Sequence, residues 1–321
     1  MLQSFAACSN DKDFWQLAKE IYDFQILYNP IYSEYDNLTA GLKLEIGNIS
    51  FLPISFFKTH EIKSGDWTEE GIFTSSGTTG SISSRHFIYD SLFYLNNAAH
   101  IFESYYGSIE KTCFLCLLPS YLEREGSSLI AMCQHFIDQS EDDRSAFYLY
   151  NHNDLYTILK ILKKEKKKTV LLGVSYALLD FAESYKIFSW PDFFVIKTGG
   201  MKGKRPEMNS SELDEVLKTS FNTININAEY GMTECFSQLY SINGSTYSQS
   251  NFIKVVITDL SDPFVFTNKG KSGRINIIDL ANINTCSFIA TDDVGYINEH
   301  DQVVVQGRID NSDLRGCNML L

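Results

Sequence analysis

Short apolar segments alternate with helical segments over the middle of the chain, and this alternation constrains the fold more than any other feature of the sequence. Apolar strands separated by single helices form crossover units and a mainly parallel sheet. Towards the C-terminus the strand-like segments 252–260, 273–280 and 303–308 have no helices between them. We therefore predict an α/β body with a β-rich subdomain at its C-terminal end. The expected strands of the body are 112–118, 146–150, 169–174, 193–198 and 224–227, and its expected helices are 127–138, 153–167, 175–186 and 210–220.

The region before this alternation contains further predicted elements. Apolar residues at helical spacing over 11–28, with Asn10 as the cap, predict a first helix. A loop follows, and after it come a short strand at 71–74 and a helix at 91–106. No internal repeat and no long linker divides the chain, so we expect one continuous unit. Its expected parts are an N-terminal helical segment at 1–50, the α/β body at 51–250 and the β-rich subdomain with the C-terminal tail at 251–321.

The composition excludes several classes of partner and location. A net charge of −13 would repel a phosphate backbone, so we expect no nucleic-acid partner. No stretch approaches the roughly 18 apolar residues of a membrane span, and the N-terminus lacks the charged and apolar regions of a signal peptide. Seven irregularly spaced cysteines fit reduced thiols, so we predict a cytoplasmic protein. Cys113 and Cys116 fall in an apolar strand and face opposite sides, which predicts core cysteines rather than a metal site.

Hydroxyl residues and glycines follow the expected strand at 71–74. Backbone N–H groups and hydroxyls in such a loop can bind phosphate oxygens. The spacing differs from that of the G-x-x-x-x-G-K-[ST] loop, and no Lys follows the last glycine. A plain turn is the alternative, because Ser, Gly and Thr are common turn residues. The candidate phosphate-binding residues are Ser76, Gly77, Thr78, Thr79 and Gly80.

A second run, Ala-Glu-Tyr-Gly-Met-Thr-Glu at 228–234, comes just after the expected strand at 224–227. Ligands of α/β sheets bind beyond the C-terminal ends of parallel strands. Tyr230 offers a stacking surface there, and a glycine allows close approach. Thr233 offers a phosphate contact and Glu234 a ligand for Mg²⁺. An ordinary loop is the alternative.

Two further runs contain carboxylates near the C-terminus, Thr-Asp-Asp-Val-Gly-Tyr at 291–296 and Gly-Arg-Ile-Asp at 307–310. A carboxylate such as that of Asp293 can hold both hydroxyls of a ribose, and an arginine such as Arg308 can join it. Turns containing Asp and Gly are common, so each run alone is weak evidence.

The order of these four motifs resembles that of the adenylate-forming (acyl-adenylate) enzyme superfamily, over roughly residues 50–318. The resemblance implies the large N-terminal domain of the adenylate-forming fold, with ATP and Mg²⁺ as cofactors. In such enzymes the substrate carboxylate attacks the α-phosphorus of ATP and pyrophosphate leaves. Catalysis of this kind rests mostly on positioning and charge stabilisation.

The resemblance also assigns roles residue by residue. Binding of the triphosphate is implied for Ser76, Gly77, Thr78, Thr79 and Gly80. The adenine is implied for Gly199, Gly200 and Tyr230, and Gly231 is a further cofactor-binding residue. Thr233 would contact the α-phosphate, Glu234 would bind Mg²⁺, and Asp293 with Arg308 would hold the ribose hydroxyls.

Two departures from the superfamily pattern stand out. Its loop usually carries a Lys soon after the last glycine, whereas this sequence has Arg85, which supplies charge in a different geometry. His86 follows, and we expect it either to contact the nucleotide or acid or to be structural. The chain ends at Leu321, so we expect the small mobile C-terminal domain of most relatives to be absent.

A narrower resemblance concerns the runs at 51–60, 118–128 and 315–318. They are similar to those of the acyl-protein synthetase family of bacterial bioluminescence systems. That family activates fatty acids, carries the acyl group on a cysteine near the C-terminus and passes it to an acyl-reductase partner. The resemblance implies Cys317 as the acyl-carrying residue, where nearby Arg315 favours the thiolate.

Two alternative functions remain open at this stage. One is an aryl- or acyl-coenzyme A ligase that lacks its C-terminal domain. The other is a non-catalytic nucleotide-binding subunit of an acyl-reductase complex. For an acyl-protein synthetase, an acyl-carrier protein is an alternative partner to the acyl reductase.

Overall fold

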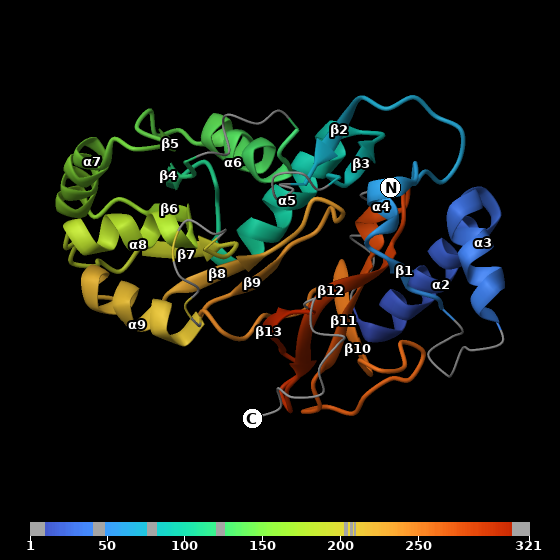
Figure 1. Ribbon diagram of the computed structural model, residues 1–321. Helices are drawn as coiled ribbons and strands as arrows, with labels where there is room; N and C mark the ends of the chain where they lie inside the picture. The colour runs from blue at the N-terminus through green and yellow to red at the C-terminus, as the bar shows by residue number, and fades with distance from the viewer. Residues whose placement is uncertain are drawn as a thin grey trace.

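Over the residues that it describes, the structure, a computed structural model, contains three sheets (Figure 1). Six strands form the first sheet, two form a hairpin, and five form the third. The described residues are 10–40, 49–75, 82–119, 126–201, 205, 208 and 210–309.

The six-stranded sheet is the centre of the α/β body and has the order β5-β4-β6-β7-β8-β9. All neighbours in it are parallel except β8 and β9, which confirms the predicted mainly parallel sheet. The strands are β4 (Cys113–Leu117), β5 (Ala146–Tyr148), β6 (Thr169–Val174), β7 (Phe193–Thr198), β8 (Asn227–Tyr230) and β9 (Leu239–Ser241).

Helices cover both faces of this sheet. Phe114 of β4 contacts aromatic residues of α5 and α6, whereas Phe193 of β7 contacts α9. The register pairs Cys113 with Thr169 and Thr169 with Phe193, so Phe114 and Phe193 lie on opposite faces. Strands covered on both faces are apolar throughout, as β4 is. The helices are α5 (Ser91–Tyr106), α6 (Ser128–Gln139), α7 (His152–Glu165), α8 (Ser175–Ser184) and α9 (Ser210–Phe221).

The predicted strand at 224–227 is wrong in its position. Strand β8 begins only at Asn227, which pairs with Ile196 of β7, and it runs through Tyr230. Ile224 is 87% exposed and belongs to the turn after α9. The alternation of isoleucine and asparagine before 227 imitates a strand, but these residues find no partner strand in the described chain.

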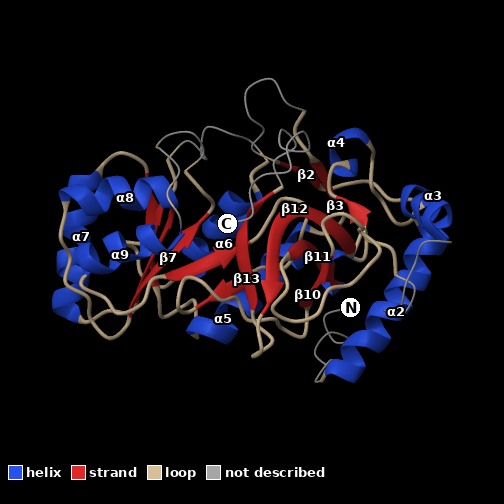
Figure 2. Ribbon diagram, turned by 60° about the horizontal axis from the view of Figure 1, so that its bottom comes forward, coloured by secondary structure: helices blue, strands red, loops and turns tan. Residues whose placement is uncertain are grey.

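The five-stranded sheet lies beside this body (Figure 2) and has the order β1-β12-β11-β10, with β13 also paired to β12. It confirms the predicted β-rich part, although its longest strand, β12, was not among the predicted strands. The polar run at 291–293 interrupts the apolar pattern of β12. The hydroxyl of Thr291 nevertheless bonds the carbonyl of Ile275, 2.7 Å away in β11. The strands are β1 (Leu52–Pro53), β10 (Ile253–Thr258), β11 (Gly273–Asp279), β12 (Phe288–Ile297) and β13 (Val303–Arg308), with a 3-10 turn, η3 (Leu280–Asn282).

Two helices at the start of the described chain pack against this sheet. Helix α2 (Asp11–Tyr28) begins at the predicted cap, because the Asn10 side chain accepts a bond from the amide of Asp13. Helix α3 (Pro30–Thr39) was expected to be a loop; Asn29 caps it and Pro30 occupies its first turn. Gln25 of α2 bonds the backbone around residue 283, which fixes the helix to the far end of the chain.

The remaining elements form a hairpin and a short helix. Strands β2 (Gly71–Thr74) and β3 (Arg85–Ile88) pair antiparallel, and α4 (Phe56–Thr59) packs near β3. Cys113 and Cys116 are buried in β4, as predicted. In the part of the chain that the structure describes, no helix is both long and apolar enough to cross a membrane.

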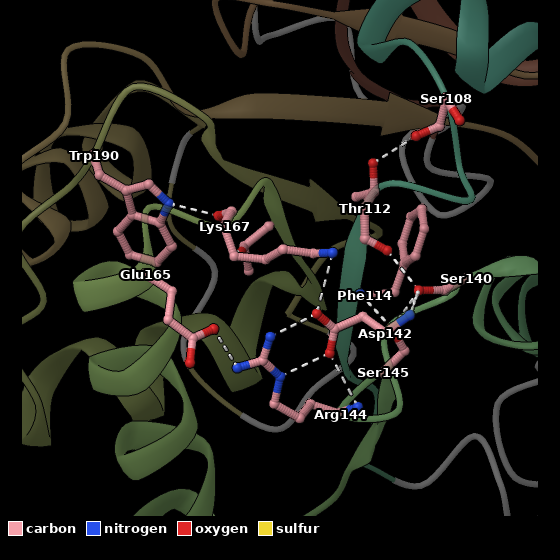
Figure 3. Close-up of polar contacts among 11 residues, drawn as sticks. Ser108, Thr112, Phe114, Ser140, Asp142, Arg144, Ser145, Glu165, Lys167 and Trp190 are labelled. Atoms are coloured by element: carbon pink, nitrogen blue, oxygen red, sulfur yellow. Dashed lines mark hydrogen bonds and ion pairs between the residues drawn. The ribbon is translucent and has the colours of Figure 1, made fainter.

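A buried carboxylate, that of Asp142, lies where the strands of the six-stranded sheet begin, away from the carboxyl ends of β7 and β8. Figure 3 shows Asp142 between Arg144 and Lys167. Arg144 donates two bonds of 2.7 Å to the Asp142 carboxylate, whose side chain is 4% exposed, and Lys167 lies 3.3 Å away. The hydrogen bonds from Arg144 hold the pKa of Asp142 well below its usual range. The Ser145 hydroxyl donates to the Ser140 hydroxyl and accepts the amide of Phe114, the second residue of β4. This cluster therefore fixes where β4 begins.

We predict that Asp142→Asn lowers the free energy of unfolding by about 3 kcal/mol, because Lys167 loses this ion pair and Arg144 keeps only the one with Glu165. Urea unfolding measures the change. The neighbouring Asp143 is exposed, so Asp143→Asn is the matched control and should stay within about 0.5 kcal/mol of wild type. Equal stabilities of the two variants would contradict this role for Asp142.

Candidate functional site

The carboxyl ends of β7 and β8 lie side by side, and two of the predicted motifs follow them. Thr198 pairs with Glu229 in the strand register, and the Thr198 hydroxyl donates to the Glu229 carboxylate. Gly199 turns away from β7 with φ of +60°, a conformation that favours glycine, and its carbonyl accepts a 2.6 Å bond from Ser175. Gly200 is exposed. The predicted glycine turn therefore stands at the same sheet edge as the run at 228–234.

Tyr230 joins the two large sheets through Asp293. Its hydroxyl donates a 2.6 Å bond to Asp293 Oδ2, while Arg308 Nε donates a 3.0 Å bond to Asp293 Oδ1. Burial and the neighbouring carboxylate raise the pKa of Tyr230 well above its usual range. Arg308 stands opposite Asp293 in the register of β12 and β13, and its side chain is 80% exposed. Three residues that the sequence predicted separately are therefore in direct contact.

Local structure explains why Asp293 sits in the run Thr-x-Asp-x-Gly. The Thr291 hydroxyl bonds both the Ile275 carbonyl and the Asp293 amide, which fixes the backbone before the carboxylate. After it, the register between β12 and β13 shifts between Val294 and Gly295. A Cβ on Gly295 would overlap the backbone carbonyl of Val304, so only glycine allows this close approach.

Glu234 is buried next to the loop end of the β2–β3 hairpin, where Ser75 and Ser84 lie. Burial raises its pKa, while a hydrogen bond from Ser84 and the charges of Arg308 and Lys58 act in the opposite direction. Thr233 is half-buried beside it. Ser84 also donates its amide to the Ser75 hydroxyl at 2.8 Å, so the described residues on either side of the predicted phosphate loop meet each other here.

His86 holds three separate segments together. Its Nδ1 donates a 2.7 Å bond to the Thr233 carbonyl, and its Nε2 lies 2.9 Å from the Thr285 hydroxyl. Asn282 completes the joint by donating a 2.7 Å bond to the Glu234 carbonyl. Burial lowers the pKa of His86 to about 4, so the ring is neutral near pH 7. Of the two expectations for His86, the structural one fits these contacts.

Other predicted residues are placed less centrally or fall outside the described chain. Arg85 is exposed at the start of β3, with its guanidinium 5.5 Å from the centre of the Phe87 ring. Gly231 is exposed, and a Cβ there would overlap Glu229 Oε1. The predicted residues outside the described chain are Ser76, Gly77, Thr78, Thr79, Gly80 and Cys317.

Sequence reasoning assigned no role to Glu229, Asn282 or Asp279. The Asp279 carboxylate accepts the amides of Phe236 and Ser237, at 2.7 and 2.9 Å, and so fixes the chain after Glu234. A buried acidic residue at the end of an apolar strand was the available signal for Asp279.

The charged residues of this site suit a metal ion that a nucleotide brings with it. Among the described residues, no group of three or more His, Cys, Asp or Glu side chains converges as a metal site. Mg²⁺ bound to substrate phosphates needs only one or two protein carboxylates. Glu234 offers one such carboxylate beside Thr233.

We predict that replacing His86 changes the pH dependence of stability. The unfolded imidazole binds a proton near pH 6.5 and the folded one only near pH 4, so wild-type stability conferred by neutral His86 is lost as the pH falls between these values. The full loss of unfolding free energy over this pH range is about 3 kcal/mol, and His86→Asn should not show it. The stability difference between the two proteins should therefore shrink from pH 7 to pH 4 in urea unfolding. Parallel curves would contradict a buried neutral His86; exposed His300→Asn serves as the control.

Several solved structures, ligases among them, are similar in fold to this chain. A 2-hydroxyisobutyryl-CoA ligase in complex with 2-HIB-AMP matches 94% of this chain and 68% of its own, with a TM-score of 0.68 and 12% identity. ATP-bound MatB from Rhodopseudomonas palustris matches 74% of this chain with a TM-score of 0.53 and 15% identity. A long-chain-fatty-acid-CoA ligase, FadD1, from Archaeoglobus fulgidus matches 74% with a TM-score of 0.51 and 20% identity.

The chain corresponds to only part of the length of these proteins. The chain spans 47% of the length of MatB and 51% of that of FadD1. No family model matches the sequence, and no curated protein sequence matches it either. The mixed sheets, their order and these matches together show that the chain has the fold of the large N-terminal domain of adenylate-forming enzymes.

Proposed function

We propose that this chain activates a carboxylic acid with ATP to form an acyl-adenylate, at the carboxyl edge of β7 and β8. The observation that carries the proposal is the contact of Tyr230, Asp293 and Arg308 beside Glu234. These residues lie far apart in the sequence, and the family resemblance implies a role in ATP binding for each of them. The fold of ATP-bound ligases agrees with this reading.

The nucleoside would bind where the two sheets meet. Asp293 keeps acceptor capacity beyond the two bonds that fix it, because a carboxylate offers about four lone-pair sites. That capacity suits the two ribose hydroxyls. The exposed guanidinium of Arg308 keeps further donors available at the same place. The aromatic ring of Tyr230 and the glycine turn at 199–200 would flank the adenine.

The reacting phosphorus would lie over the loop at 231–234. A carboxylate oxygen of the acid attacks the α-phosphorus, a new P–O bond forms, and the bond to pyrophosphate breaks. Thr233 would donate its hydroxyl to an α-phosphate oxygen and so stabilise the charge that develops there. Mg²⁺ on Glu234 would supply further neutralisation of phosphate charge when bound. His86 acts one step away, because its bond to the Thr233 carbonyl holds this loop in place.

The acid and the acyl acceptor remain sequence-based proposals. The resemblance to acyl-protein synthetases favours a fatty acid and transfer of the acyl group to the Cys317 thiol. In that step the thiolate attacks the acyl carbon, a thioester forms, and AMP leaves. Transfer to coenzyme A, and a nucleotide-binding subunit without catalysis, are the competing readings.

We predict that Asp293→Asn raises the KM for ATP about 10- to 100-fold in a pyrophosphate-release assay with a panel of carboxylic acids. Losing charge-assisted bonds to the ribose costs about 1.5–3 kcal/mol, which corresponds to this range. Asp292 is adjacent and half-buried, and Asp292→Asn is the matched control with unchanged KM. No pyrophosphate from any acid, together with no binding of ATP, would sink the proposed function.

We also predict that acyl transfer depends on Cys317. The protein, Mg²⁺-ATP and a radiolabelled fatty acid should give a protein-bound label that hydroxylamine removes. Cys317→Ala should abolish the label while pyrophosphate release continues. A label retained in Cys317→Ala would exclude this cysteine as acceptor, and formation of an acyl-coenzyme A would instead favour the ligase reading.

A further inference from the structure

Three buried side-chain oxygens have no hydrogen-bond partner among the residues that the structure describes. They are Gln238 Oε1, Tyr240 Oη and Tyr106 Oη. A buried polar atom without a partner costs about 1–3 kcal/mol, so folded proteins keep few of them. The ring centroids of Tyr106 and Tyr240 are 5.6 Å apart, and Gln238 directly precedes β9, two residues before Tyr240. The three oxygens therefore belong to one region of the interior.

The same region contains a buried carboxyl group. Glu229 stands beside Tyr240 in the register of β8 and β9. Its Oε2 accepts the Thr198 hydroxyl, and no bond from a described residue reaches its Oε1. Burial raises the pKa of Glu229 to about 7. Burial, with a smaller contribution from the Glu229 carboxyl, raises the pKa of Tyr106 and of Tyr240. We name Glu229, Gln238, Tyr240 and Tyr106 together the polar recess.

The polar recess begins directly under the loop of the proposed active site. A Cβ on Gly231 would overlap Glu229 Oε1 and would lie 3.3 Å from Gln238 Cγ, so both side chains reach up to this exposed glycine. Thr233, which we assign to the α-phosphate, follows two residues later. An acid whose carboxylate meets that phosphorus must place the rest of its carbon chain near Gly231.

Two acceptors stand together at this end of the recess. Gln238 Nε2 bonds the Phe236 carbonyl at 3.3 Å, which leaves Oε1 as the free end of the amide. Ionised Glu229 likewise presents Oε1 as an acceptor. A plain hydrocarbon chain would leave both unpaired, whereas an amino or hydroxyl group would donate to them.

We propose that the polar recess reads a hydrogen-bond donor on the substrate, so that this chain activates carboxylic acids whose carbon chain carries an amino or hydroxyl group. The inference rests on the proposed function for its setting. It makes Glu229 and Gln238 specificity-determining residues, and it narrows the proposed fatty acid to one whose chain carries such a group.

Acids with one carbon skeleton test the proposal. Hexanoate is compared with its 2-amino, 2-hydroxy, 6-amino and 6-hydroxy derivatives for pyrophosphate release by wild type, Glu229→Gln and Gln238→Leu. We expect at least one derivative to exceed hexanoate tenfold or more in kcat/KM. Glu229→Gln and Gln238→Leu should each reduce that ratio at least tenfold, mainly by lowering kcat/KM for the derivative. The amino and hydroxyl arms show which donor the recess prefers.

Equal or higher kcat/KM for hexanoate, or an unchanged ratio in both variants, would overturn the proposal. Exposed Glu215→Gln is the control variant, and thermal unfolding of each variant establishes that it folds. A ligand-induced rise in Tm with the same acids, measured in the presence of ATP, is independent of turnover. Suppose that Tm rises only with a derivative, that Glu229→Gln abolishes this rise, and that no acid yields pyrophosphate. The polar recess would then bind its ligand, and the proposed adenylation would be wrong. No rise and no pyrophosphate with any of the acids would overturn the recess too, because bound water alone would then explain the unpaired oxygens.

Discussion

The buried imidazole of His86 is the joint on which the candidate site depends. It belongs to a two-stranded hairpin, yet it bonds the loop after β8 and the turn that leads into β12. One ring nitrogen, Nδ1, donates to the Thr233 carbonyl, while Nε2 lies 3.0 Å from Asn282 Oδ1 and 2.9 Å from the Thr285 hydroxyl. Together with the bond from Ser84 to Glu234, this joint fixes Thr233 and Glu234 relative to the hairpin.

The two large sheets meet at a second set of polar contacts. Tyr230 crosses from β8 to Asp293 of β12, and Asp279 of β11 binds the backbone just after Glu234. Each bond is buried or half-buried, where competition from water is weak and an unpaired partner is costly. The site is therefore built from the ends of strands that face each other across the two sheets, with the polar recess on the side of the parallel sheet.

Local patterns predicted the elements well, and the contacts between them poorly. The strands at 169–174 and 193–198 and the helix at 91–106 agree with the structure at both ends, because apolar runs and periodicity are local signals. Strand β12 was missed, since its polar residues pair only with distant neighbours. The family motifs placed Asp293 and Arg308 together but did not indicate that Tyr230 contacts Asp293. Glu229 gave no signal, because its partners come from α5, β7 and β9.

The spacing of the joint along the chain has a consequence for folding. His86 and Thr285 are separated by 199 positions, and Tyr230 and Asp293 by 63. Contacts between such distant residues form late, because the chain must close a long loop before they stabilise it. During synthesis the parallel sheet is complete well before β12 leaves the ribosome. Until then His86 lacks Thr285 and Tyr230 lacks Asp293, so a partly made chain exposes polar groups that are paired in the finished protein.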